Sequence, residues 1–299
     1  MGLLGAMPGA IAQGLVWGIM AIGVYITYKI LDIADLTVDG SLCTGAAVCA
    51  MMAISGVNIW ICILCALFAG MLAGLVTGLF HTVLGIPAIL SGILTQLMLW
   101  SVNLKIMGKA NQVLPARNVA VLLTQLNNGR AVLFLVIALG VIIGILYWFF
   151  GTEIGCSLRA TGCNLNMSRA QGINTGLNKV LGLMISNGLV ALSGALLAQY
   201  QGFADVNMGR GAIVIGLAAV IIGEALFSFV ARNFAVRLMS VALGSVIYFM
   251  VYQTVIFLGL DTDLLKMLSA LVVAVFLGTP YLKANYFSAP RKKEEKDHA

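Results

Sequence analysis

The feature that most constrains this chain is the length of its stretches without a charged side chain. No Asp, Glu, Lys or Arg occurs before Lys29, and none occurs between Asp39 and Lys105. A helix that crosses the roughly 30 Å hydrocarbon core of a bilayer needs about 20 apolar residues, so the second stretch has room for about three spans. Further uncharged runs cover 131–152, 180–204, 211–223, 238–260 and 267–282. The chain is therefore expected to cross a membrane many times.

Composition supports the same class of protein. Hydrophobic residues make up 61% of the chain and charged residues 9%, whereas a soluble domain carries roughly 25% charged residues. The apolar runs lack the alternation of about 10 residues that marks a strand of a transmembrane barrel. We therefore predict an all-α polytopic transmembrane protein. The first run has no basic residues before it, which favours a first span over a secretory signal peptide.

Nine spans are predicted, together forming one transmembrane domain over residues 1–282, followed by a charged cytosolic tail over 283–299. The spans are 9–30, 42–56, 58–82, 87–107, 131–151, 179–200, 210–227, 234–258 and 264–282. Pro87 and the abundant glycines allow some of them to be broken where neighbouring protein covers the freed backbone groups. Gly70, Gly74 and Gly78 share one helix face, as do Gly140 and Gly144, and both sets favour close packing within the chain.

The distribution of basic residues predicts the orientation. If the polar loop 152–178 is cytoplasmic, most of the 17 Lys and Arg residues lie inside, as the positive-inside rule prefers. The N-terminus is then outside and the C-terminus is cytoplasmic, although the loop 108–130 places basic residues outside. The net charge of +6 is spread over span ends and the tail, which favours contact with lipid headgroups and not nucleic acid.

Catalytic and metal-binding patterns are not found in the sequence. His81 and His298 are too few and too far apart for a metal site or a base–nucleophile pair, and no phosphate-binding GxxxxGK[ST] loop occurs. Cys62 and Cys65 form a CxxC without a second pair, which favours packing over metal binding. We therefore expect a chain that is not an enzyme and holds no metal.

Two segments of the chain resemble each other. IADLTVDGS at 33–41 and FADVNMGRG at 203–211 each follow an apolar span and precede a helix of small residues. Spans one to four would then correspond to spans six to nine, with the fifth as a linker. Because the first half starts outside and the second inside, the repeats would be inverted, a common transporter design.

Charged residues within apolar runs are candidates for a solute pathway, because such residues should face protein or water. They are Asp35, Asp39, Asp205, Arg210 and Glu224. Alternatives remain open for several of them. Asp35 and Asp205 can cap the helices that follow or line a pathway. Arg210 can meet a substrate carboxylate or Asp205, and Glu224 can pair with Arg232.

The stretch 158–194 mixes polar, glycine and charged residues and runs directly into a helix at Lys179. A polar helical hairpin of this kind can contact a soluble partner, and a plain cytosolic linker is the alternative. The stretch resembles the permease subunits of the branched-chain amino acid/ribose class of ABC importers, in which L-R-A-x-G-x-N and A-x-x-G-I-N precede a Lys-led helix that ends in S-G. Here the second segment is A-x-G-I-N, with one residue fewer between Ala170 and Gly172. The matching positions are Leu158, Arg159, Ala160, Gly162, Asn164, Ala170, Gly172, Ile173, Asn174, Lys179, Ser193 and Gly194.

The membrane motif of the same family, Asp and an apolar residue followed by Gly-Ser, resembles Asp35-Leu36 and Gly40-Ser41. The resemblance covers roughly residues 10–282. It implies an ATP-driven importer in a bacterial cell membrane, with this chain as the membrane-spanning permease. Within the class the chain most resembles permeases for tryptophan or tyrosine uptake, so an aromatic amino acid is the expected solute.

The resemblance also implies the partners. They are an ABC ATP-binding subunit, which would hold the ATP and Mg, an external substrate-binding protein or lipoprotein, a second permease copy that completes a homodimer, and membrane lipid. No cofactor is implied for this chain itself. Because ATP hydrolysis belongs to the partner subunit, the permease would contribute the pathway and the contact that switches it.

Two groups of functional residues follow from the resemblance. A coupling segment, about 153–178, would contact the ATP-binding subunit and tilt the spans as that subunit closes. Its contact residues would be Arg159, Ala160, Gly162, Asn164, Arg169, Ala170 and Gly172. The translocation pathway would be lined by Asp35, Asp39, Gly40, Ser41, Asp205, Gly209 and Arg210.

Two other functions compete with this interpretation. An ion-coupled secondary transporter of a small polar solute fits the inverted repeats and the membrane carboxylates equally well, but does not account for the coupling segment. A membrane-embedded enzyme would need a cluster of His or carboxylate side chains on the polar loops, which the sequence does not offer.

Overall fold

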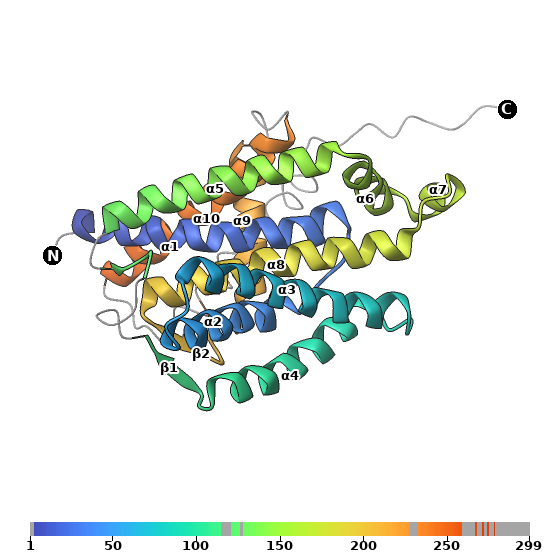
Figure 1. The fold of residues 1–299 in the computed structure, drawn as a ribbon. Helices are drawn as coiled ribbons and strands as arrows, with labels where there is room; N and C mark the ends of the chain where they lie inside the picture. The colour runs from blue at the N-terminus through green and yellow to red at the C-terminus, as the bar shows by residue number, and fades with distance from the viewer. Residues whose placement is uncertain are drawn as a thin grey trace, which may run out of the picture.

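The uncharged runs form long helices that lie side by side in a bundle (Figure 1). The computed structural model describes residues 3–114, 121–125, 128–227 and 233–258, with four single positions between 267 and 278. The first helix, α1 (Leu3–Tyr25), continues into a π-helical turn, η1 (Ile26–Ile30). The other long helices are α2 (Val38–Ile54), α3 (Ile59–Thr82), α4 (Ala88–Met107), α5 (Asn128–Gly151), α8 (Thr175–Gln201), α9 (Ala212–Phe227) and α10 (Phe234–Phe257).

Six of these helices are long and apolar enough to cross a membrane. The other two, α2 and α9, have 17 and 16 residues, so each is only about 25 Å long and shorter than the roughly 30 Å hydrocarbon core. Eight of the nine predicted spans thus correspond to helices. The ninth, 264–282, and the tail 283–299 lie outside the described residues, apart from the single positions. The predicted all-α class is confirmed.

Polar residues and glycines fix where the helices begin and end. The side-chain oxygen of Asn58 accepts a hydrogen bond of 3.0 Å from the first turn of α3, and that of Asn174 accepts one of 3.1 Å from the first turn of α8. Such caps satisfy backbone N–H groups that have no partner within the helix. Gly108 and Gly202 end α4 and α8 with φ angles of +69° and +78°, a conformation that glycine adopts without steric cost.

Close contacts between helices rely on the predicted glycine face. Gly70, Gly74 and Gly78 of α3 all point at α8, where a side chain at any of them would meet the partner helix. This confirms that small residues let these helices approach closely. Gly140 and Gly144 of α5, in contrast, have no described atom within 4 Å of the position that a methyl side chain would occupy. Their predicted packing within the chain is therefore not found among the described residues.

The two ends of the bundle differ (Figure 1). At one end, α6 (Glu153–Cys163) and α7 (Leu165–Ala170) form a hairpin that projects beyond the long helices. At the opposite end, β1 (Asn111–Val113) pairs antiparallel with β2 (Phe203–Asp205). The sequence does not predict this small sheet, because three-residue strands are too short to show a period.

Candidate functional site

The first turns of α2 and α9 meet. Asp39, the second residue of α2, accepts hydrogen bonds of 3.0 Å from the backbone N–H groups of Gly211 and Ile213. Its carboxylate therefore caps the N-terminus of α9. The N–H of Gly209 donates to the Cys43 sulfur at 3.1 Å, and Gly209 lies so close to the Asp39 carbonyl that a side chain would not fit. Predicted pathway residues from both repeats are thus brought together.

Asp35 and Asp205 make the same local turn in the two repeats. A carboxylate oxygen of Asp35 accepts from the N–H of Thr37 at 2.9 Å, and one of Asp205 accepts from the N–H of Asn207 at 2.6 Å. In such a turn the side-chain carboxylate accepts a hydrogen bond from the backbone N–H two residues further along the chain. The geometry therefore favours the capping alternative for Asp35, whose turn leads directly into α2. Asp205 holds only its own turn, because α9 begins at Ala212 and is capped by Asp39.

A buried polar network ties α8 to the turn before α2. The amide nitrogen of Asn187 donates to Asp35 at 2.6 Å, and the hydroxyl of Ser41 donates to the amide oxygen of Asn187 at 2.6 Å. All three side chains are buried. Asp35 and Ser41 belong to the predicted pathway, but their polar groups form hydrogen bonds with other residues of the protein.

Replacing Asn187 by leucine should destabilise the protein by about 3 kcal/mol, because it leaves a buried carboxylate and a buried hydroxyl without this partner. Thermal unfolding of the purified protein in detergent measures the effect. The control is Asn166→Leu, the same substitution at an exposed position, for which a change within about 0.5 kcal/mol is expected. Equal unfolding temperatures for the two variants would contradict the structural role of Asn187.

A cavity of about 280 Å³ opens beside the junction of α2 and α9. Three predicted pathway residues line it, namely Asp39, Gly40 and Arg210. The remaining polar wall comes from α4, which the sequence-based prediction does not include. The α4 residues at the cavity are Gln96, Leu97, Trp100 and Asn103. Gln96, Trp100 and Asn103 follow an i, i+4, i+7 spacing, so a polar and aromatic face on an apolar helix is the signal that could have found them.

Asn103 is the most unusual residue of the cavity wall. It is 0% exposed, and neither the nitrogen nor the oxygen of its side chain has a hydrogen-bond partner in the described part of the chain. A buried polar group without a partner costs about 1–3 kcal/mol, and native proteins contain few of them. Because both polar atoms are shielded from the cavity as well, a molecule inside it would reach the amide only once the side chain turns toward that space.

Arg210 is exposed at the same cavity. Among the described residues, Lys29 and Glu224 form an ion pair, and no carboxylate lies within 4 Å of the Arg210 guanidinium group. The alternative that pairs Arg210 with Asp205 is therefore not found. A carboxylate supplied by a solute is the alternative that remains.

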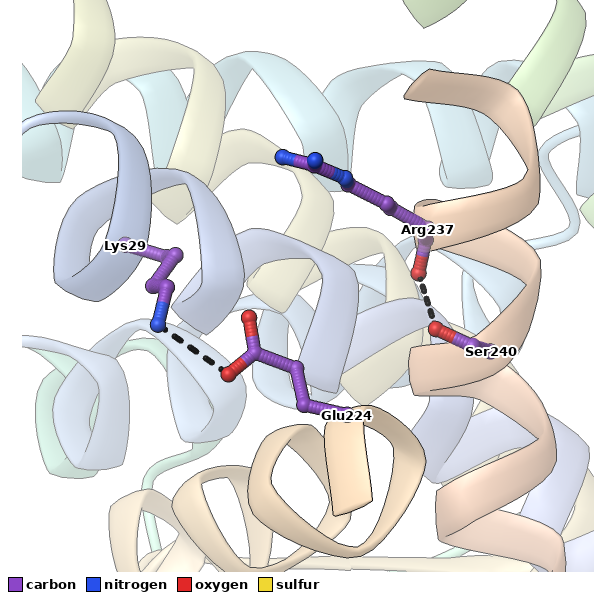
Figure 2. Close-up of polar contacts among 4 residues, drawn as sticks. All are labelled: Lys29, Glu224, Arg237 and Ser240. Atoms are coloured by element: carbon purple, nitrogen blue, oxygen red, sulfur yellow. Dashed lines mark hydrogen bonds and ion pairs between the residues drawn. The ribbon is translucent and has the colours of Figure 1, made fainter. Parts of the chain in front are cut away.

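Glu224 lies at the far end of α9 and joins that helix to the end of α1. Its carboxylate is 3.1 Å from the ammonium group of Lys29 (Figure 2). Because the two side chains are 39% and 50% exposed, the pair contributes only about 0–1 kcal/mol. Figure 2 also shows the side chain of Arg237 extending from α10 toward the same region. Arg232, the predicted partner, lies outside the described residues.

The hairpin of α6 and α7 is held against the bundle by two residues of the predicted coupling motif. The Arg159 guanidinium donates to the Phe150 carbonyl at 2.9 Å and lies 5.9 Å from the ring centroid of Phe234. Gly162 lies against the Ile30 carbonyl with no space for a side chain. Arg159 and Gly162 therefore attach α6 to the bundle.

Other predicted coupling residues shape the tip of the hairpin. The side-chain oxygen of Asn164 accepts two hydrogen bonds of 3.0 Å from the first turn of α7. Arg169 donates to the hydroxyl of Thr175 at 3.2 Å, and Gly172 has a φ of +77° at the turn into α8. Polar and glycine residues of the motif thus hold the tip in one conformation.

The exposed surface of the tip mixes apolar side chains with the polar side chains of Asn166, Arg169 and Gln171. Met167 is 59% exposed and Leu165 is 37% exposed, and Ala170 is also exposed. Ala160, in contrast, is half-buried on α6. The sequence-based prediction does not include Leu165 and Met167, because they stand at positions that the motif does not specify.

Residues 7–277 match the protein family described as the branched-chain amino acid transport system, permease component. The chain belongs to this family. It is therefore the permease subunit of an ABC transporter, a transport component without catalytic activity of its own. Membership also implies an ATP-hydrolysing partner and a binding protein.

Known proteins resemble the permease over most of its length. The tyrosine transport system permease protein of Clostridioides difficile is 42% identical over 95% of this chain and 96% of its own length. An uncharacterized protein of Rickettsia prowazekii is 34% identical over 90% of this chain and 96% of its own.

A solved structure, PsaBC from Streptococcus pneumoniae in complex with Fab, superposes on the permease with a TM-score of 0.51. It covers 92% of this chain and 93% of the matched chain, at 17% sequence identity. At this identity the likeness concerns the fold alone. It supports an arrangement of helices shared with that chain.

Proposed function

We propose that the permease imports an aromatic amino acid, tyrosine or tryptophan, as the membrane-spanning part of an ATP-driven importer. The observation that carries the proposal is the 42% identity, over 95% of the chain, to a protein named as a tyrosine transport permease. An external binding protein or lipoprotein would deliver the amino acid, and two permease copies would form the translocation unit above two ATP-binding subunits. ATP and Mg would be held by those subunits.

Several contacts support inverted repeats within the permease. The third helix of each repeat packs on the first helix of the other, so that α3 lies along α8 and α10 lies along α1. The short helices α2 and α9 begin at a shared junction, where the Asp39 carboxylate caps α9. Short helices that start inside the membrane are where transporters of this design hold solutes.

The projecting hairpin supports a coupling role at the cytoplasmic end. With the N-terminus outside, α5 ends and α8 begins on the cytoplasmic side, and the hairpin between them extends beyond the bundle (Figure 1). Leu165 and Met167, the large apolar side chains exposed at its tip, are suited to contact a protein. In this proposal the ATP-binding subunits move the tip, and α6 transmits the motion to the end of α1.

Uptake into proteoliposomes tests the proposed function. The permease is reconstituted with its ATP-binding subunit and binding protein, and accumulation of radiolabelled L-tyrosine and L-tryptophan is measured with and without ATP inside. ATP-dependent uptake that excess unlabelled leucine or ribose does not reduce is the expected result. Uptake that follows an imposed ion gradient in the absence of the ATP-binding subunit would instead establish the ion-coupled alternative.

A further inference from the structure

We propose that the cavity beside the junction of α2 and α9 is a binding site of the permease itself for the free aromatic amino acid. Asn103, Arg210 and Asp39 would bind the polar groups, and Trp100 would contact the ring. This inference rests on the proposed function and deepens it. It adds a recognition step inside the membrane after the binding protein has released the solute.

The cavity has the size and position that such a step requires. Its volume of about 280 Å³ lies near the lower end of the roughly 300–1,000 Å³ of small-molecule pockets, which suits a single amino acid. Its walls come from α2, from α4 and from the connection between β2 and α9. Because the walls belong to separate elements, a shift of one helix against the others would open or close the site.

The buried amide of Asn103 points to a ligand. Its nitrogen and oxygen have no partner among the described residues although the residue is 0% exposed, and it lies on the cavity wall. An asparagine side chain offers N–H donors and a carbonyl acceptor. Turned toward the cavity, it would donate to a carboxylate or accept from an ammonium group, and a solute that offers such a partner would relieve the unpaired amide.

The charges at the cavity match a zwitterion. Arg210 is exposed at the cavity and forms no ion pair with a described carboxylate. This group favours a carboxylate. The Asp39 carboxylate accepts backbone hydrogen bonds from Gly211, Ala212 and Ile213 and keeps acceptor capacity for an ammonium group, since an ionised carboxylate accepts about four.

The α4 side of the cavity is suited to an aromatic ring. Trp100 is 44% exposed and Leu97 is 63% exposed, and both line the cavity. An indole ring contacts another aromatic ring favourably in stacked or edge-to-face geometry. An aliphatic solute would lose this contact, so the wall predicts a preference for aromatic amino acids over leucine.

Direct binding tests the proposal. The permease and its ATP-binding subunit are placed in lipid nanodiscs without the binding protein, and binding of radiolabelled L-tyrosine is measured. Asn103→Leu should weaken binding about tenfold or more, because the apolar side chain cannot hydrogen-bond. Its thermal stability should be unchanged or higher, since an unpaired buried amide is replaced by an apolar group. The control is Ser101→Leu, the same substitution at an exposed position of α4, which should bind like the wild type.

A second variant tests the assignment of charges. In wild-type protein, tyramine, which lacks the carboxylate, should compete much more weakly than tyrosine. In Arg210→Gln the two competitors should become similar, because the cation that distinguishes them is gone. A structural role of Arg210 would not change this ratio.

Two different failures are distinguishable by measuring uptake with the complete importer in parallel. If the wild type imports tyrosine but binds none in nanodiscs, or if Asn103→Leu binds as tightly as the wild type, the internal site is refuted and the proposed function stands. If the wild type neither imports nor binds aromatic amino acids, both proposals fail together.

Discussion

Replacing Gly74 by valine should destabilise the permease by about 3 kcal/mol or more, the largest effect expected for a single substitution in the bundle. A side chain at Gly74 would overlap the Leu183 carbonyl and press on the Met184 backbone of α8. A backbone cannot rotate aside as a side chain can, so the two helices would have to separate. The expected result is a fall of roughly 6–12 °C in the unfolding temperature in detergent, with reduced yield of folded protein.

Gly140→Val is the matched control for this experiment. It introduces the same side chain into another transmembrane helix, at a glycine with no described atom within 4 Å of the new methyl position. We expect its stability to stay within about 0.5 kcal/mol of the wild type. If both variants lost stability equally, the cause would be the loss of glycine as such, and the close contact of α3 with α8 would not explain the result.

Replacing Met167 by glutamate should abolish ATP-driven uptake, with at least about a tenfold loss, while the permease still folds. Met167 is 59% exposed at the tip of the hairpin, so the charge costs nothing in the isolated permease. In an apolar contact with the ATP-binding subunit, however, an unpaired carboxylate would be buried at a high cost. Co-purification of the ATP-binding subunit and uptake in proteoliposomes are the two measurements.

Val113→Glu provides the control at the opposite end of the bundle. Val113 is 63% exposed in β1, so the substitution changes an equally exposed apolar residue into the same acid. It should leave co-purification of the ATP-binding subunit intact. Loss of the subunit with both variants, or with neither, would contradict a docking role of the hairpin tip.

The choice of Met167 also shows how the structure changes the interpretation of the coupling motif. Arg159 and Gly162 carry the family resemblance, but the structure turns both toward the bundle. Substituting them would therefore damage the attachment of α6 and could not separate folding from coupling. Met167 instead lies at an exposed position that the motif does not specify, so its substitution tests the proposed contact without disturbing that attachment.

The sequence by itself determined the class of protein, eight of the helices and the family. These features are local, because lipid forces uncharged runs to satisfy their own backbone as helices, and a motif is read along the chain. Only the tertiary structure decided that Asp35 and Ser41 form hydrogen bonds with Asn187 and that α4 completes the cavity. The identity of a residue's neighbours depends on which helices lie side by side. That arrangement is set by packing between segments far apart in sequence, which neither hydropathy nor spacing records.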